Sequence, residues 1–261
     1  MAFLNENGYE GFQETDGLLI ASIPESEKDE DLLLQILNRI SGDKNTISFT
    51  SVVLPDVNWN AKWENDFQPI EIDDFVRIRA SFHPPDPAYK FDLLIDPKMS
   101  FGTGHHETTR LMIRAMKSIL FRGKRVVDLG CGTAILSILA SRMGADEIIA
   151  VDIDHWAVEN SWENVKANQC TNINVLHGDA DLLMNDRFDI ILANINRNVL
   201  LEYMYSMAIM LPAGGDLILS GILFQDRDAI LHSATKHGFI ERDVTREKEW
   251  CAMTFYKEPD R

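Results

Sequence analysis

The stretch K-R-V-V-D-L-G-C-G-T-A-I-L-S-I-L-A-S-R-M-G-A-D-E-I-I-A-V-D-I-D, residues 124–154, decides the fold. It opens with a short β-branched run that ends at Asp128, which is typical of a buried strand. Gly130 and Gly132 follow at once, and the apolar residues after them recur at helical spacing. The stretch therefore predicts a strand, a glycine turn and a helix.

A second apolar run, residues 148–151, ends at Asp152 about 20 residues after the first glycine. Glycines at a strand-to-helix turn let a ligand approach the backbone closely, because no Cβ intervenes. An acid at the tip of the next strand can accept hydrogen bonds from both hydroxyls of a ribose. Position 135 is Ile, so the dinucleotide pattern G-x-G-x-x-G is incomplete. The unit predicts a site for an adenosine-containing cofactor.

The rest of the chain repeats this alternation of strands and helices. We expect further strands at residues 173–176, 188–193, 216–220 and 250–256, and helices at 106–120, 155–168, from 198 onward and at 226–237. The pattern predicts an α/β fold in residues 91–261, a doubly wound Rossmann-like sheet. Trp250 is expected to be a packing residue.

Residues 1–57 read as a small α+β domain, with strands at 18–23 and 47–54 and an amphipathic helix at 29–40. This segment carries eleven acids and three bases. Two interpretations stay open: a docking surface for a basic partner, or a solvated acidic surface. Residues 58–90 are expected to form a linker helix, with one face made by Trp59, Trp63 and Phe67, and a connecting strand at 75–80.

Composition limits the function classes. The 261 residues are 45% hydrophobic, which is ample for a core, and the net charge is -16. Such a charge argues against direct nucleic-acid binding. No apolar run is long enough to span a membrane, and the N-terminus does not resemble a signal peptide. Three scattered cysteines favour reduced thiols in a cytoplasmic protein, which we expect to be a monomer.

A second glycine-bearing loop lies at residues 95–109, I-D-P-K-M-S-F-G-T-G-H-H-E-T-T. A loop of this kind that leads into a helix offers backbone N–H groups and hydroxyls to a polar ligand. The neighbouring His105 and His106 suggest a metal, but two adjacent histidines on a turn rarely converge on one ion without further ligands. We therefore expect no metal site.

These motifs together resemble a known family. The loop is similar to the D-P-G-x-A-F-G-T-G-T-H-P-T-T signature of the PrmA family, class I S-adenosylmethionine (AdoMet) methyltransferases that modify the eleventh protein of the large ribosomal subunit. The resemblance covers roughly residues 56 to 257 and continues, in the family's order, through V-V-D-L-G-C-G-T-A-I-L-S-I, V-D-I-D-H-W-A-V-E-N, A-N-I (193–195), L-S-G-I-L (219–223) and E-W-C (249–251). The chain departs from the pattern at His105, Glu107 and Ala134, where the family has Thr, Pro and Gly.

The resemblance implies AdoMet as cofactor and repeated N-methylation of lysine side chains and an α-amine on that basic ribosomal protein, with the N-terminal domain docking it. It implies cofactor roles for Thr109, Gly130, Asp152 and Asn194, to which the turn geometry adds Gly132. Asn194 is the residue that could orient the target amine. Asp179, in the loop after the strand at 173–176, is a further candidate near the adenine.

Three other functions stay open from the sequence. The chain could methylate another protein or a small amine, because the N-terminal segment carries the least of the resemblance. It could also be a non-catalytic AdoMet-binding module, since Ala134 adds a methyl group near the cofactor. A nucleotide-dependent dehydrogenase is the remaining alternative.

Overall fold

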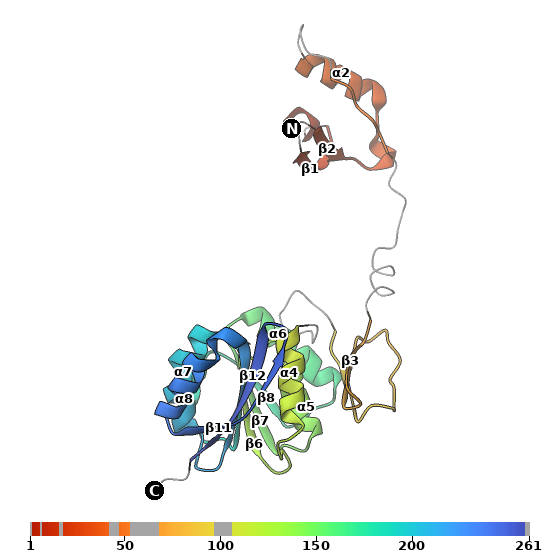
Figure 1. Ribbon diagram of the computed structural model, residues 1–261. Coiled ribbons are helices and arrows are strands. Elements are labelled where there is room, and N and C mark those ends of the chain that lie inside the picture. The colour runs from red at the N-terminus through yellow and green to blue at the C-terminus, as the bar shows by residue number, and fades with distance from the viewer. Residues whose placement is uncertain are drawn as a thin grey trace. The chain divides into compact units, whose positions relative to one another are not determined.

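The computed structural model describes residues 2–5, 7–15, 18–41, 47–52, 68–96 and 106–258 (Figure 1). The chain divides into two compact units, Met1–Lys62 and Trp63–Arg261. The finer division into domains 1–57, 58–90 and 91–261 stays a prediction.

The N-terminal unit is a small α+β structure. Its elements are α1 (Ala2–Asn5), β1 (Glu10–Thr15), β2 (Leu18–Ser22), a 3-10 turn η1 (Glu25–Glu27) and α2 (Glu30–Ser41). Strands β1 and β2 pair antiparallel. Leu4, Tyr9 and Ile36 are buried at its centre. The strand predicted at 18–23 and the helix predicted at 29–40 are confirmed as β2 and α2.

The strand predicted at residues 47–54 is wrong over 47–52, which lie outside any helix or strand. Ile47, Phe49 and Val52 are exposed there. A β-branched run forms a strand only when a neighbouring strand takes its backbone hydrogen bonds, and none of the described strands pairs with this segment. The aromatic stripe of the predicted linker helix and the glycines at 102 and 104 lie outside the described residues.

Seven of the described strands form one sheet in the second unit, in the order β11-β12-β10-β9-β6-β7-β8. The strands are β6 (Arg125–Leu129), β7 (Glu147–Asp152), β8 (Ile173–His177), β9 (Ile190–Asn194), β10 (Asp216–Leu223), β11 (Phe239–Glu247) and β12 (Trp250–Lys257). Strands β8, β7, β6, β9 and β10 run parallel, and β12 runs antiparallel to both of its neighbours. The chain order reverses between β6 and β9, the point at which open α/β sheets bind ligands.

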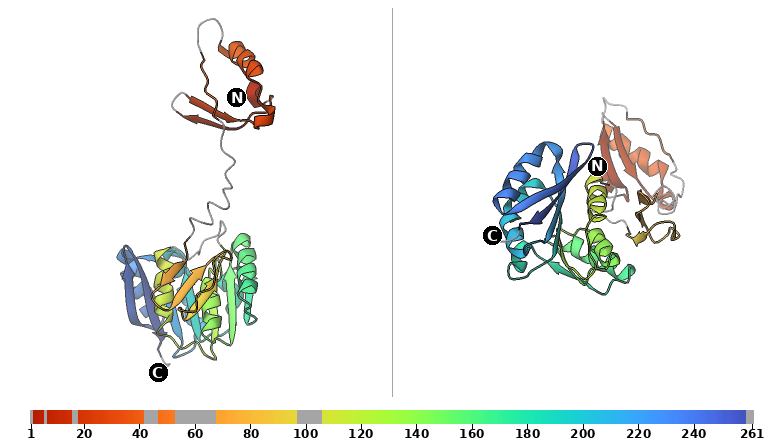
Figure 2. Two further views of the ribbon diagram at one scale, coloured as in Figure 1. Left: turned by 90° about the vertical axis from the view of Figure 1, so that its right-hand side faces the viewer. Right: turned by 60° about the horizontal axis from the view of Figure 1, so that its bottom comes forward.

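Alternate residues of the central strands enter two separate cores. Val126, Ile148 and Leu192 face one core, and their neighbours Val127 and Ile149 face the other. This period of two lets one short apolar run bury both of its faces. Helices cover the two faces (Figures 1 and 2): α4 (Glu107–Met116), α5 (Ile135–Arg142) and α6 (His155–Ala167) on the first, and α7 (Arg197–Met210) and α8 (Arg227–Lys236) on the second.

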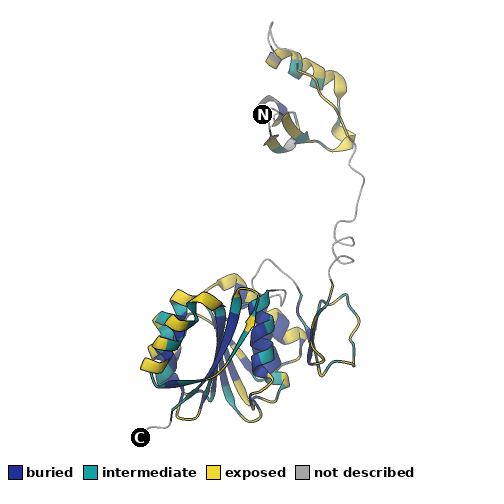
Figure 3. Cartoon of the chain, viewed as in Figure 1, coloured by how far each residue is buried: buried dark blue, intermediate teal, exposed yellow. Residues whose placement is uncertain are grey.

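The sheet is therefore the buried layer of the second unit, and the helices expose their outer sides (Figure 3). The 3-10 turns η3 (Ala180–Leu183) and η4 (Phe224–Asp226) follow β8 and β10. The doubly wound fold predicted for this part of the chain is confirmed. Among the described residues, no helix is both long enough and apolar enough to cross a membrane.

A three-stranded sheet of β3 (Ile70–Ile72), β4 (Val76–Arg79) and β5 (Phe91–Leu94) precedes α4. Only β4 was expected from the sequence. One buried side chain joins this sheet to α6. Asn168 donates from Nδ2 to the Leu94 carbonyl at 2.6 Å, and its Oδ1 accepts from the Leu94 N–H at 3.0 Å. The amide thus satisfies both backbone groups of a residue at the edge of the small sheet.

We expect Asn168→Ala to lower the free energy of unfolding by about 2 kcal/mol, because the substitution leaves two partly buried backbone groups of Leu94 without these partners. Urea unfolding monitored by circular dichroism measures the change. Asn174→Ala, at an exposed position of β8, is the control and should stay within about 0.5 kcal/mol of the wild type. Equal effects of the two substitutions would contradict this role for Asn168.

Candidate functional site

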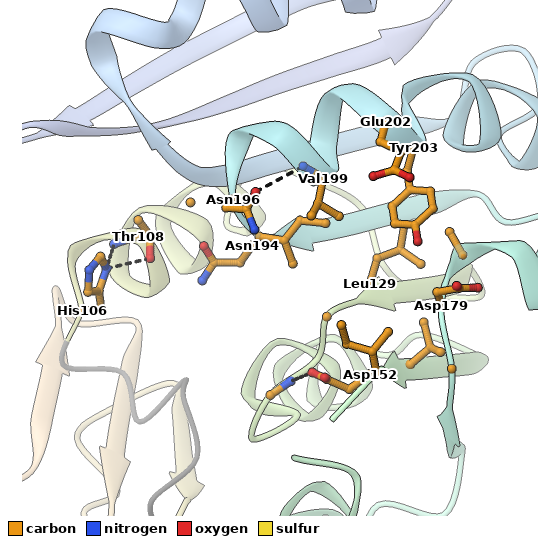
Figure 4. A pocket seen from close by; sticks show the side chains of 18 of the residues that line it. His106, Thr108, Leu129, Asp152, Asp179, Asn194, Asn196, Val199, Glu202 and Tyr203 are labelled. Atoms are coloured by element: carbon orange, nitrogen blue, oxygen red, sulfur yellow. Dashed lines mark hydrogen bonds between the residues drawn. The ribbon is translucent and has the colours of Figure 1, made fainter. Parts of the chain in front are cut away.

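A pocket of about 490 Å³ opens where β6, β7 and β9 end, at the reversal of the strand order (Figure 4). Its volume lies in the range of small-molecule and cofactor sites. Of the five residues predicted to hold the cofactor, Gly130, Gly132, Asp152 and Asn194 lie together in its lining, and Thr109 does not. Their roles toward a cofactor stay predictions.

The turn after β6 has a backbone that glycine adopts most easily. Gly130 and Gly132 have φ angles of 71° and 57°. A Cβ at Gly130 would lie 2.3 Å from Cγ2 of Ile195, so a side chain at this position would collide with the segment after β9. The absence of a side chain lets the two strand ends approach each other around the pocket.

Asp152 is held in place by backbone donors at the end of β7. Its Oδ2 accepts from the Gly132 N–H at 2.8 Å, and its Oδ1 accepts from the Asp154 N–H at 3.0 Å. Each carboxylate oxygen has a further lone pair, so Asp152 retains acceptor capacity toward the pocket. The exposed Ile153 beside it, 74% exposed, also lines the pocket.

Asn194 ends β9 and has an unsatisfied acceptor. Its Nδ2 donates weakly to the Thr109 hydroxyl at 3.5 Å, and its buried Oδ1 has no hydrogen-bond partner among the described residues. Buried carbonyl oxygens without a partner are rare, and a ligand donor, a water or an ion is the usual partner at such a position. Thr109 itself is buried behind Asn194, whereas Thr108 and His106 reach the pocket lining.

Gly221 fixes the position of the segment that follows Asn194. It lies at a register irregularity of β10 and has a φ of 83°. A Cβ there would lie 2.3 Å from the Ile195 carbonyl oxygen and 2.9 Å from the Ile195 nitrogen. The backbone after β9 therefore rests directly on Gly221, and the direction of Asn194 depends on this contact.

His106 and Trp250 form the wall next to Asn194. The two rings meet edge to face, with centroids 4.8 Å apart. His106 also caps α4 by accepting from the Thr108 N–H. The expectation that Trp250 is a packing residue is incomplete, because Trp250 packs on His106 and also lines the pocket.

A row of alternating charges holds α4 against its neighbours. Glu107 pairs with Lys248 at 2.5 Å, and Arg110 and Arg114 both bind the carboxylate of Glu247. The hydrogen bond from Lys248 lowers the pKa of Glu107 to about 2. Because Lys248 and Glu247 belong to the β11–β12 hairpin, the row fixes the helix start that carries His106 beside the hairpin that carries Trp250.

Sequence reasoning missed the residues that α7 contributes. Val199, Glu202 and Tyr203 line the pocket, Glu202 and Tyr203 at the end where Asp179 lies and Val199 beside Asn196. Their spacing on α7 is the ordinary spacing of one helix face, so the sequence gives no signal that separates a pocket face from a packing face. Asp179 is part of the lining, as suggested.

Asp128, the first acid of the opening motif, lies behind the pocket. It is 1% exposed, its Oδ2 accepts from the Ser137 hydroxyl at 2.7 Å, and its Oδ1 has no partner among the described residues. Burial raises the pKa of this carboxyl to about 7, and the charge of Asp152 adds to the shift. No group of three or more potential metal ligands occurs among the described side chains.

The family profile described as "Ribosomal protein L11 methyltransferase (PrmA)" matches residues 3–258. The chain belongs to this family. A relative from Porphyromonas gingivalis named ribosomal protein L11 methyltransferase is 41% identical over 97% of this chain and 88% of its own length. One of the same name from Bacteroides fragilis is 42% identical over 97% of this chain and 91% of its own length.

Solved structures support the fold. A ribosomal protein L11 methylase from Lactobacillus delbrueckii subsp. bulgaricus superimposes with a TM-score of 0.69 at 24% identity, over 74% of this chain and all of the other. The 16S rRNA N2 G1207 methyltransferase of T. thermophilus, solved with AdoMet and guanosine, gives a TM-score of 0.52 at 24% identity, over 61% and 45% of the two chains. The Rossmann-like methyltransferase fold is thus shared with both.

One departure from the PrmA signature has a structural consequence. Ala134, where the signature has Gly, caps α5 with φ 61° and ψ 20° and is fully buried. A residue with a Cβ pays about 1 kcal/mol for the left-handed conformation. The turn keeps its shape at that cost, because the N–H of Ala134 bonds to the Cys131 carbonyl at 2.8 Å.

We expect Gly221→Ala to abolish cofactor binding and to lower the free energy of unfolding by about 2 kcal/mol or more, because its Cβ would displace the backbone of Ile195, which lines the pocket. Gly214→Ala is a matched control: φ at Gly214 is 78°, but a Cβ there meets nothing within 4 Å. It shares the backbone strain without the collision. Calorimetric titration with the cofactor measures the affinity of both variants, and urea unfolding measures their free energy of unfolding. If Gly214→Ala lowers both quantities as much as Gly221→Ala does, the contact between Gly221 and Ile195 is not important.

We expect Asp128→Asn to change how stability depends on pH. Between the unfolded pKa near 3.8 and the folded value of about 7, the folded wild type holds one more proton than the unfolded chain. The stability of the wild type relative to the variant should therefore fall as pH rises through this window, by up to about 1.4 kcal/mol per unit, and level off above it. Urea unfolding at pH 5, 6, 7 and 8 measures the slope. Parallel curves would contradict a raised pKa.

Proposed function

We propose that this protein transfers methyl groups from AdoMet to amino nitrogens of ribosomal protein L11, its lysine side chains and its α-amine. The family and the names of its relatives support the substrate. The unsatisfied Oδ1 of Asn194 is the observation that carries the chemistry, because it is a buried acceptor without a described donor, on a residue that lines a pocket suited to an adenosine cofactor.

The residues of the pocket fit AdoMet. Asp152 offers acceptors for two ribose hydroxyls, and Ile153 offers an apolar surface for the purine. Gly130 and Gly132 let the cofactor approach the backbone. Asp179, at the far end of the pocket, can accept from the exocyclic amine of adenine. When bound, AdoMet supplies a methyl group already activated by its sulfonium.

The task left to the chain is to present a neutral amine along the correct line. A free lysine has a pKa of about 10.4, and a site that excludes water lowers it because the charged form loses its solvation. The rings of His106 and Trp250, packed against each other, form the wall of the pocket beside Asn194 and limit the access of water there. Oδ1 of Asn194 would accept one N–H of the amine and aim its lone pair, and alignment of this kind supplies much of the rate.

The charge and the cysteines of the chain suggest where its substrate docks and where it acts. We infer that the basic substrate docks on the acidic N-terminal domain, and that the enzyme acts as a cytoplasmic monomer without binding nucleic acid directly. The net charge of -16 complements a basic ribosomal protein. The three cysteines are free, which agrees with a reducing compartment.

Incubation with AdoMet and purified L11 tests the function, and intact-mass spectrometry should show gains in whole methyl increments on L11. Asn194→Ala should lower kcat about 100-fold while reducing AdoMet affinity less, since it removes the group that aims the amine. Asn198→Ala, at an exposed residue in the first turn of α7 that lies outside the pocket lining, should leave kcat unchanged.

The outcomes separate the alternatives. If the protein binds AdoMet and adds mass to another protein or amine but not to L11, the substrate is that other molecule and not L11. AdoMet binding without transfer to any amine would favour a non-catalytic module. Failure to bind AdoMet at millimolar concentration would refute the proposal as a whole.

A further inference from the structure

Asp179 is oriented by the backbone before any ligand arrives. It follows Gly178 at the end of β8, and its Oδ1 accepts from the Asp181 N–H at 3.0 Å, which caps η3. Figure 4 shows Asp179 and Asn194 at opposite ends of the pocket. One oxygen of the carboxylate is thus engaged by the backbone, and the other can meet groups from α7 or from a ligand.

Tyr203 of α7 places a candidate second donor on the same side of the pocket as this carboxylate. Its ring lines the pocket, and its hydroxyl points toward Asp179 (Figure 4). Burial raises the pKa of the Tyr203 hydroxyl, and the charges of Asp179 and Glu202 and a hydrogen bond to Asp179 add to the shift. The hydroxyl therefore stays protonated at neutral pH and can donate to the carboxylate.

Two donors fix the carboxylate more tightly than one. The Asp181 N–H holds one oxygen of Asp179, and donation from the Tyr203 hydroxyl, which points toward the carboxylate, would give the remaining lone pairs a defined direction. An ionised carboxylate only accepts hydrogen bonds. It therefore attracts a purine that carries an amino group at position 6 and repels one that carries a carbonyl there. Its selectivity depends on how well the carboxylate is oriented.

We propose that Tyr203 is a positioning residue that orients Asp179 and thereby sets the preference of the pocket for a 6-amino purine over a 6-oxo purine. This inference rests on the proposed use of AdoMet and extends it to residues outside the glycine turn. Neither α7 nor its tyrosine belongs to the motifs by which the sequence resembles its family.

The chain provides a matched control on the same helix. Tyr205 lies two residues beyond Tyr203, is 60% exposed, and has its ring near His237 with centroids 6.1 Å apart. It does not line the pocket. Tyr205→Phe removes the same hydroxyl from the same helix without touching Asp179.

The experiment compares two ligands by calorimetric titration: S-adenosylhomocysteine and S-inosylhomocysteine, which differ at purine position 6. The wild type should prefer the adenosyl ligand by about 100-fold or more, because the 6-oxo group would face a carboxylate. Tyr203→Phe should lower the affinity for the adenosyl ligand about fivefold and leave the affinity for the inosyl ligand almost unchanged. The ratio of the two affinities should therefore fall about fivefold. Asp179→Asn should remove most of the preference, since an amide can also donate.

Each outcome decides the matter. Tyr205→Phe should match the wild type with both ligands, and thermal unfolding of all variants shows whether folding is intact. If Tyr203→Phe weakens both ligands equally, or neither, the residue only packs and the inference is wrong, while the proposed function stands. If the wild type binds neither ligand, the proposed cofactor itself is wrong, and the inference falls with it.

Discussion

The contact of Ile195 with Gly130 and Gly221 is the constraint on which the site depends. The first residue after β9 is enclosed by two positions at which a Cβ would overlap it, one after β6 and one in β10. These three strands are neighbours at the reversal of the sheet. A pocket at a reversal point exists in any fold of this type, but its shape here is set by how closely three backbones approach. Two glycines make that approach possible.

Tertiary contacts also explain how the chain tolerates two departures from the PrmA signature. Glu107 replaces a proline that would have set the start of α4 through its fixed φ angle. In its place, the row of charges from Lys248 to Arg114 ties the helix start to the β11–β12 hairpin. Ala134 replaces a glycine and keeps the turn in the left-handed region, so the neighbouring hydrogen bonds have to offset the strain. In both places, tertiary contacts hold a geometry that the local sequence favours less.

The sequence predicted the central strands well, because each is an apolar run bounded by glycines or acids and buried on both faces. It failed for β11, where runs of charged residues hide the apolar pattern of an edge strand, and for the short strands β3 and β5. The same limit applied to the site. Asp152 and Asn194 end strands and so were visible, whereas Tyr203 lies inside a helix whose pocket face is set only when α7 packs on the sheet. The unpaired oxygen of Asn194 likewise exists only in three dimensions.

The chemistry explains why the pocket is built from backbone and amide groups and has few acids and bases at its reacting end. A sulfonium is already a good leaving group, so transfer needs a neutral nucleophile, a dry wall and a straight line of approach. In the proposed reaction, Asn194 supplies a fixed acceptor that carries no charge, and the contact of Ile195 with Gly221 holds the segment after it in place. The carboxylates Asp152 and Asp179 line the part of the pocket proposed to hold the nucleoside, where hydrogen bonds to hydroxyl and amino groups would be needed. Charge is therefore placed where the ligand is recognised, and precise geometry where the methyl group moves.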